Sequence, residues 1–285
     1  MITEAFFQLL QFLGYFVAIG AVGFRFGIVR RVRGMSPEAK TILSPDKAAL
    51  LGVVGVILLG VSYLGGPYVA SLTHGKTFVA SLPKNLPAFE LKMALLGLAL
   101  IGFLLVRAWS SVGWILAAVG VLVAVLQPVY TGRLAGKVNA VHILATSTWL
   151  GTLLVLTLIG IRGVIKSSSP GTQRAELVSE LVNSFSPLAL TAATIVALTG
   201  LTTAWLHLKR WSSLWTTGYG MTLVIKLCLV VVVVMLGAWN WRRVRPSLGG
   251  EGSEETIHRS ATWELTFGGL VLIVTSVLVS LPSPK

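Results

Sequence analysis

The sequence predicts an all-α membrane protein, a polytopic bundle of about eight transmembrane helices. Of its 285 residues, 54% are hydrophobic and only 12% are charged, whereas soluble domains carry about 25% charged residues. The mean hydropathy is +0.83. A membrane-spanning helix needs about 20 apolar residues, because the hydrocarbon core is about 30 Å thick and each residue rises about 1.5 Å. Eight such stretches occupy most of the chain, so no separate soluble domain is expected.

Each apolar stretch is expected to be helical, because a backbone in contact with lipid must satisfy its own hydrogen bonds. The first stretch is expected to be a retained helix, since it has neither the basic start nor the cleavage site of a signal peptide. The alternating pattern of a membrane β-barrel is absent. The predicted spans, in order, are residues 5–29, 48–72, 86–108, 110–130, 138–161, 185–208, 220–241 and 261–281.

The basic residues predict the orientation of these spans. Fourteen Lys and Arg lie at the C-terminal ends of the odd-numbered spans or in the connections that follow those spans. Seven lie in the other connections and at the C-terminus. Cytoplasmic connections carry the excess of Lys and Arg, so both termini are predicted to be extracytoplasmic. The net charge of +13 then reflects orientation in a lipid bilayer, and no nucleic-acid partner is expected.

Two connections have the composition of membrane-surface segments. Residues 172–184 predict an amphipathic helix that lies in the interface, with Glu176 and Glu180 on its polar face and Leu177 and Leu181 on its apolar face. Between spans six and seven, aromatic side chains recur every four residues at Trp211, Trp215 and Tyr219. This stripe is interpreted either as part of an aromatic belt or as a ligand-facing surface.

Several classes of catalytic site are excluded. The chain has one cysteine, Cys228, so intrachain disulfides, zinc ribbons and CxxC redox chemistry are impossible. It also has no phosphate-binding glycine loop, no HExxH and no GxSxG motif. No enzymatic activity is expected, unless a bound haem supplies redox chemistry.

Polar side chains inside spans are costly in hydrocarbon and are therefore functional candidates. On span five, His142, Thr146 and Trp149 share one helical face. His207 closes span six at its outer end, and Thr203 precedes it by one turn.

Further metal-ligand candidates lie toward the outer side: His74 in an outer connection, Met93 in span three and Met221 in span seven. Imidazole and thioether together suit copper. We therefore predict a copper site that contains His142, with His207, His74, Met93 and Met221 as further ligands. Two alternatives stay open. In the first, the histidines are only hydrogen-bonded interfacial residues and the methionines only fill gaps. In the second, His142 and His207 hold a b-type haem between them.

Two charged side chains lie within the last two spans. Lys226 is about two turns into span seven, on a face that continues to Asn240, and Glu264 is one turn into span eight. Either these side chains extend toward the two membrane surfaces, or they line a polar translocation path with Trp149, Thr146, Thr203 and Asn240.

From position 138 onward the chain resembles the copper-resistance D (CopD) family of membrane proteins. The resemblance is carried by the stretches VHILATSTWLGTL at 141–153, FSPLALTAATIVALTG at 185–200, LWTTGYGMTLVIKLCL at 214–229 and GAWN at 237–240, and by Glu264 leading to Pro282 in the last span. It implies importance for His142, Trp149, Lys226 and Glu264. It divides the chain into residues 1–137, similar to the family only as four apolar helices, and residues 138–285, which carry the motifs; both belong to one membrane unit.

The resemblance implies copper uptake across a bacterial plasma membrane into the cytoplasm, in the service of copper homeostasis. It also implies an extracytoplasmic copper-binding donor of the CopC type. The sequence contains no fused copper-binding domain and no His- or Met-rich tail. We therefore expect that a separate donor captures copper, or that copper is not the substrate. The rival functions are electron transfer through haem b and a non-transporting role in membrane assembly.

Overall fold

The computed structural model describes residues 2–35, 43, 45–108, 110–167, 170–207, 212–244 and 253–281. In these ranges the regular secondary structure is entirely helical. The α-helices are α1 (Ile2–Gly23), α2 (Arg30–Met35), α4 (Pro45–His74), α5 (Leu86–Leu105), α6 (Ser110–Thr131), α7 (Leu134–Thr146), α8 (Thr152–Val155), α9 (Arg162–Ile165), α10 (Gly171–His207), α11 (Ser213–Thr216), α12 (Gly218–Trp239) and α13 (Ser253–Ser280). The π-helical segments are η1 (Phe24–Val29), η3 (Ser147–Gly151), η4 (Leu156–Ile161) and η5 (Asn240–Val244), and η2 (Val79–Ser81) is a 3₁₀ turn.

The prediction of eight spans is confirmed. Within the described residues, eight helical stretches are long and apolar enough to cross a membrane. They are Ile2–Val32, Asp46–His74, Leu86–Leu105, Ser110–Tyr130, Leu134–Ile165, Gly171–Leu206, Gly218–Arg243 and Glu254–Ser280.

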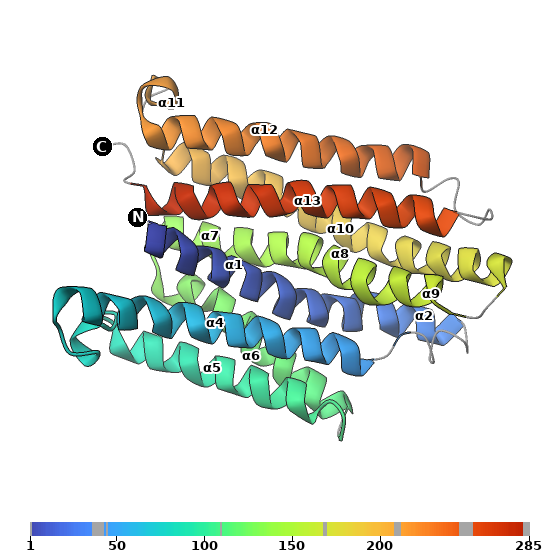
Figure 1. Cartoon of the computed structure of the whole chain (residues 1–285), viewed down its shortest axis with the longest axis horizontal. Helices are drawn as coiled ribbons and strands as arrows, with labels where there is room; N and C mark the ends of the chain where they lie inside the picture. Colours follow the sequence, from blue (N-terminus) through green and yellow to red (C-terminus); the bar gives the residue numbers. More distant parts are fainter. Residues whose placement is uncertain are drawn as a thin grey trace.

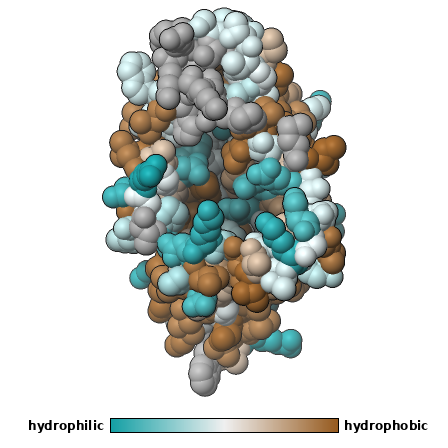
Figure 2. All heavy atoms as spheres, turned by 90° about the vertical axis from the view of Figure 1, so that its left-hand side faces the viewer, coloured by the Kyte–Doolittle hydropathy of each residue, from teal (hydrophilic) through white to brown (hydrophobic). Residues whose placement is uncertain are grey.

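Successive spans run in opposite directions, so α1 begins and α13 ends at the same end of the bundle (Figure 1). We call this the predicted outer end and the opposite one the predicted inner end, following the orientation predicted from the basic residues. Figure 2 shows the predicted outer end, where hydrophilic side chains gather across the middle of the face and hydrophobic side chains lie along its flanks.

Spans one and five form the centre of the bundle. More of their residues are buried than in any other span of the described chain. The helix α1 packs against α4 on one side and against η3, α8 and α13 on the other. Gly20 faces Gly151 so closely that a Cβ on either residue would collide with the opposite backbone. Small residues allow such close approach of helices in membranes, and here they bring the centre of α1 onto the part of span five that carries Trp149.

The segment 172–184 differs from its prediction. It is the first third of α10, continuous with span six, so the prediction of a separate interfacial helix is wrong. Its apolar face is buried inside the protein, with Leu177 5% and Leu181 0% exposed. Arg174 also pairs with Glu254 at the start of α13, with 3.5 Å between Nε and Oε1. The periodicity was interpreted correctly as helical, but its apolar face packs against protein and not against the membrane surface.

Candidate functional site in the second half of the bundle

Three polar side chains from three spans lie near one another in the outer half of the bundle, and we call them the outer cluster: His142, Thr199 and Lys226. The Nδ1 atom of His142 on α7 lies 2.9 Å from the Thr199 hydroxyl oxygen on α10. Lys226 on α12 is near enough to the His142 ring to act on it through its charge. All three residues are half-buried, so they face neighbouring helices more than lipid.

The depth of the outer cluster follows from helix geometry. His142 is eight residues from the start of α7, Thr199 eight from the end of α10, and Lys226 eight from the start of α12. At about 1.5 Å per residue, each lies about 12 Å below the outer end of its helix. The three side chains therefore share one level, below the membrane surface and within reach of the predicted outer end.

The hydrogen bonds of Thr199 indicate which nitrogen of His142 carries the proton. Thr199 donates its hydroxyl proton to the Ile195 carbonyl oxygen at 2.6 Å. Its oxygen is then left to accept from the His142 Nδ1–H group. In a neutral imidazole with a proton on Nδ1, the lone pair is on Nε2. A metal ligand whose other nitrogen is fixed in this way is a common arrangement in proteins.

A second group of polar residues lies deeper, and we call it the inner cluster: Trp149, Asn240, Ser260 and Glu264. Asn240 donates to Glu264 Oε2 at 3.1 Å and accepts from the Ser260 hydroxyl. The Trp149 side chain also hydrogen-bonds Glu264. Trp149 and Glu264 are 9% and 5% exposed. The Glu264 carboxylate is thus held inside the protein by donors from two other spans.

Two members of the inner cluster occur where the helix is locally π-helical. Trp149 lies within η3, and Asn240 is the first residue of η5. π-helical turns are rare and often occur at functional sites. The extra residue in such a turn rotates the side chains on either side of it relative to a regular α-helix. Trp149 and Asn240 are brought to Glu264 from these two irregular segments.

The remaining residues predicted as metal ligands are not gathered at the outer cluster. His74 is exposed at the end of α4, with Nδ1 2.9 Å from the Ala70 carbonyl oxygen. Met221 is 54% exposed, and Met93 packs against the hydrophobic core from α5. No group of three or more His, Cys, Asp or Glu side chains within the described ranges has the geometry to hold a metal ion.

The other predicted residues are placed as follows. His207 ends α10, and its side chain falls outside the described part of the structure. The Thr146 hydroxyl donates to the His142 carbonyl oxygen at 2.7 Å, and that of Thr203 to the Thr199 carbonyl oxygen at 2.8 Å. In the aromatic outer connection, Trp215 on α11 is 67% exposed, and Trp211 lies outside the described residues.

Sequence reasoning alone does not identify the roles of two residues in these clusters. Ser260 was not singled out, although serine one turn before Glu264 on the same helix was a usable signal. Thr199 was noted only as part of a threonine series leading to His207, yet its hydrogen-bond partner is His142. Predicting that contact requires knowing which faces of α7 and α10 meet.

The comparisons with known proteins concern this half of the chain. Residues 179–278 match the CopD family model, described as copper resistance protein D. This segment contains Thr199, Lys226, Asn240, Ser260 and Glu264. The resemblance predicted from the sequence is therefore confirmed over the segment that holds most of both clusters.

One relative is the "Copper transport protein CutJ" of Bacillus subtilis (strain 168), which is 32% identical over 143 residues. The match covers 50% of this chain and 24% of that protein, so it spans about a quarter of the relative's length. No solved structure is detectably similar to the chain. The comparisons connect this multi-pass helical bundle with copper-related membrane proteins.

Proposed function

We propose that this protein carries copper across a bacterial plasma membrane, from the predicted outer end toward the cytoplasm. The observation that carries the proposal is the CopD match over residues 179–278, because that segment supplies polar residues at two depths of the bundle. A copper-binding donor protein of the CopC type would deliver the ion to the hydrophilic face shown in Figure 2. The protein itself would move the ion without converting a substrate.

The first step is capture of copper by the outer cluster. The unprotonated Nε2 atom of His142 supplies a nitrogen ligand about 12 Å below the outer end. Imidazole accepts copper in either common oxidation state. The nearby ammonium of Lys226 repels cations that gain no bond to the ring, such as Na⁺ and K⁺. Copper gains a coordination bond at this level, and simple cations do not.

The second step is passage to the inner cluster. Trp149 follows His142 by seven residues on span five, which is about 10 Å along the axis. There the buried side chain of Glu264 offers carboxyl oxygen atoms as ligands for the ion. Its hydrogen bonds to Asn240 and Trp149 keep it oriented while no ion is present. The two levels thus offer copper first a nitrogen ligand and then an oxygen ligand on the inward route.

Copper uptake by reconstituted vesicles tests the proposal. Purified protein is inserted in liposomes, and copper entry is followed for His142→Ala and Glu264→Gln. Matched controls are His258→Ala and Glu255→Gln, which change the same residue types on α13 outside both clusters. We expect the initial rate of copper uptake to fall at least about tenfold in the cluster variants, because each loses one ligand among few. The control variants should keep the rate of the unmodified protein.

Other outcomes distinguish the rival functions. Unchanged uptake in both folded cluster variants would overturn the proposed path. Copper binding without any uptake by the unmodified protein would favour a non-transporting assembly role. A strong Soret band in the purified protein that is lost in His142→Ala would instead favour a haem-based electron-transfer function.

A further inference from the structure

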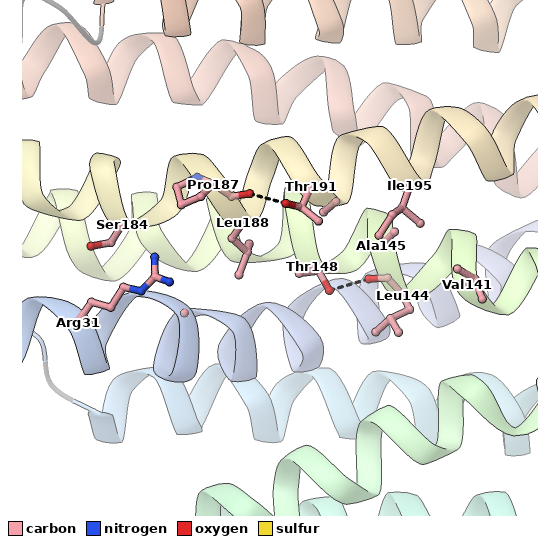
Figure 3. A pocket seen from close by; sticks show the side chains of 12 residues that line it. Arg31, Val141, Leu144, Ala145, Thr148, Ser184, Pro187, Leu188, Thr191 and Ile195 are labelled. Carbon is pink, nitrogen blue, oxygen red and sulfur yellow. Dashed lines mark hydrogen bonds between the residues drawn. The ribbon is translucent and has the colours of Figure 1, made fainter.

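A cavity of about 450 Å³ lies beside the outer cluster and shares no lining residue with either cluster. It is bordered by span one, span five and α10 (Figure 3). On α7 it is lined by Val141, Leu144 and Ala145, whereas His142 on the same helix belongs to the outer cluster. The lining residues of the cavity are therefore distinct from those of the proposed copper path.

The wall of the cavity is effectively hydrocarbon. Thr148 donates its hydroxyl to the Leu144 carbonyl oxygen at 2.8 Å, and Thr191 donates to the Pro187 carbonyl oxygen at 2.9 Å (Figure 3). Both hydroxyl protons are consumed within their own helices, so neither threonine is left to donate to a guest. Aliphatic side chains such as Leu188 and Ile195 form much of the remaining wall. This lining suits an acyl chain and not a polar solute or a metal ion.

One end of the cavity carries a cation. Arg31 on α2 is exposed and lies beside Ser184 and Pro187 (Figure 3). Within the part of the chain that the structure describes, no carboxylate forms an ion pair with it. Arg31 is at the predicted inner end of span one, the depth at which lipid headgroups lie and at which anionic lipids attract basic side chains.

Along α10 the cavity is about as long as one leaflet of the bilayer. Ser184 and Ile195 mark its extent along α10, and eleven helical residues span about 16 Å. One leaflet of hydrocarbon is about 15 Å thick. The cavity is long enough for one acyl chain of a single leaflet.

We propose that this cavity is a binding site for an anionic phospholipid of the cytoplasmic leaflet. One acyl chain fills the groove between η1, α7 and α10, and the headgroup phosphate pairs with Arg31. Arg31 supplies the preference for an anionic headgroup, and the groove supplies affinity for any acyl chain. The two contributions are separable by substitution.

Native mass spectrometry of the purified full chain tests the site. The probes are phosphatidylglycerol and phosphatidylcholine with identical acyl chains. We expect phosphatidylglycerol to be retained about fivefold better, which corresponds to about 1 kcal/mol per basic residue near an anionic lipid. Arg31→Ala should abolish this preference, and Arg31→Lys should keep most of it. The control is Arg30→Ala, which removes an adjacent exposed arginine that does not line the cavity.

The groove is tested by Thr191→Phe, which fills the cavity from an exposed position of α10. It should reduce retention of both lipids while the thermal unfolding midpoint stays within a few degrees of that of the unmodified protein. Equal retention of the two lipids by the unmodified protein would overturn the proposal, as would equal losses in Arg30→Ala and Arg31→Ala. A lipid-free dimer that Thr191→Phe dissociates would instead assign the groove to a second copy of the chain.

Discussion

The Asn240 side chain connects two residues of α13 through both ends of its amide. It donates to Glu264 and accepts from Ser260, so it positions the buried carboxylate and is itself held in one orientation. A carboxylate inside a membrane bundle is costly unless donors surround it. Asn240 is therefore the residue on which the geometry of the inner cluster most depends.

Replacing Asn240 with Leu should lower the free energy of unfolding by about 1 to 2 kcal/mol, because two hydrogen bonds between spans are lost and Glu264 keeps fewer donors. The measurement is thermal or denaturant-induced unfolding in detergent micelles. Thr266→Val is the control, since the Thr266 hydroxyl is exposed and bonds only to its own helix. Equal stability of the two variants would contradict the assigned role.

Thr199→Val should weaken copper binding at the outer cluster by about tenfold or more, the usual effect of removing the partner of a metal-ligating histidine. The physical reason is that the His142 ring loses the acceptor that fixes its Nδ1 proton. Copper titration of the purified protein measures the effect. Thr202→Val, which changes an exposed threonine one turn away from that contact, should leave the affinity unchanged; a similar loss in both variants would count against the His142 ligand.

At the scale of the helix, close packing of α1 against span five depends on glycine. We expect Gly20→Ala to destabilise the protein, because the added Cβ collides with the backbone of Gly151. The matched control is Gly97→Ala on α5, where an added Cβ meets nothing within 4 Å. Alanine favours a helix over glycine by about 1 kcal/mol, so the control should be neutral or slightly stabilising.

Unfolding midpoints in detergent give the comparison between these two variants. If both glycines respond alike, backbone propensity and not helix contact determines the effect. If Gly20→Ala alone unfolds at lower temperature, the contact between α1 and span five is confirmed as a determinant of stability.

The spans could be predicted from the sequence because each requirement of the bilayer is local. A span must be long enough and apolar enough, and its backbone must form its hydrogen bonds within the helix. The role of residues 172–184 could not, since an amphipathic face that includes Leu177 and Leu181 fits a membrane surface and a protein surface equally well. Packing against protein is distinguished from packing against the membrane by contacts with residues far along the chain, such as the ion pair of Arg174 with Glu254.

For the candidate site, the sequence indicates how far along each helix a residue lies. It does not indicate which neighbouring helix the side chain of that residue faces. The sequence placed His142, Met93 and Met221 toward the outer side, yet depth alone does not say which face of a helix meets its neighbour. Met221 and Lys226 are five residues apart on α12, which turns them about 140° from each other. Lys226 faces inward toward His142, and Met221 is left exposed. The π-helical turns at Trp149 and Asn240 change direction further and have no simple signature in the sequence.

For the whole molecule, we expect the predicted outer end to face away from the cytoplasm, because the excess of Lys and Arg lies at the other end. Single cysteines are introduced in a Cys228→Ser background and labelled in intact cells with a reagent that does not cross membranes. Positions Lys76 and Lys137 should react, and Arg107 and Lys166 should not. The opposite pattern would reverse the direction of the proposed copper path.

The central position of α1 has a consequence for biosynthesis. This helix leaves the ribosome before its partners η3, α8 and α13 have been translated. The face around Gly20 therefore lacks these partners in the bilayer while more than a hundred further residues are inserted. Until span five arrives, only α4 and its neighbours cover α1. Chains interrupted after α6 would present this uncovered glycine face to lipid. A separately expressed fragment that begins at residue 138 would lack the same contact, and the two fragments should accumulate only when they are made together.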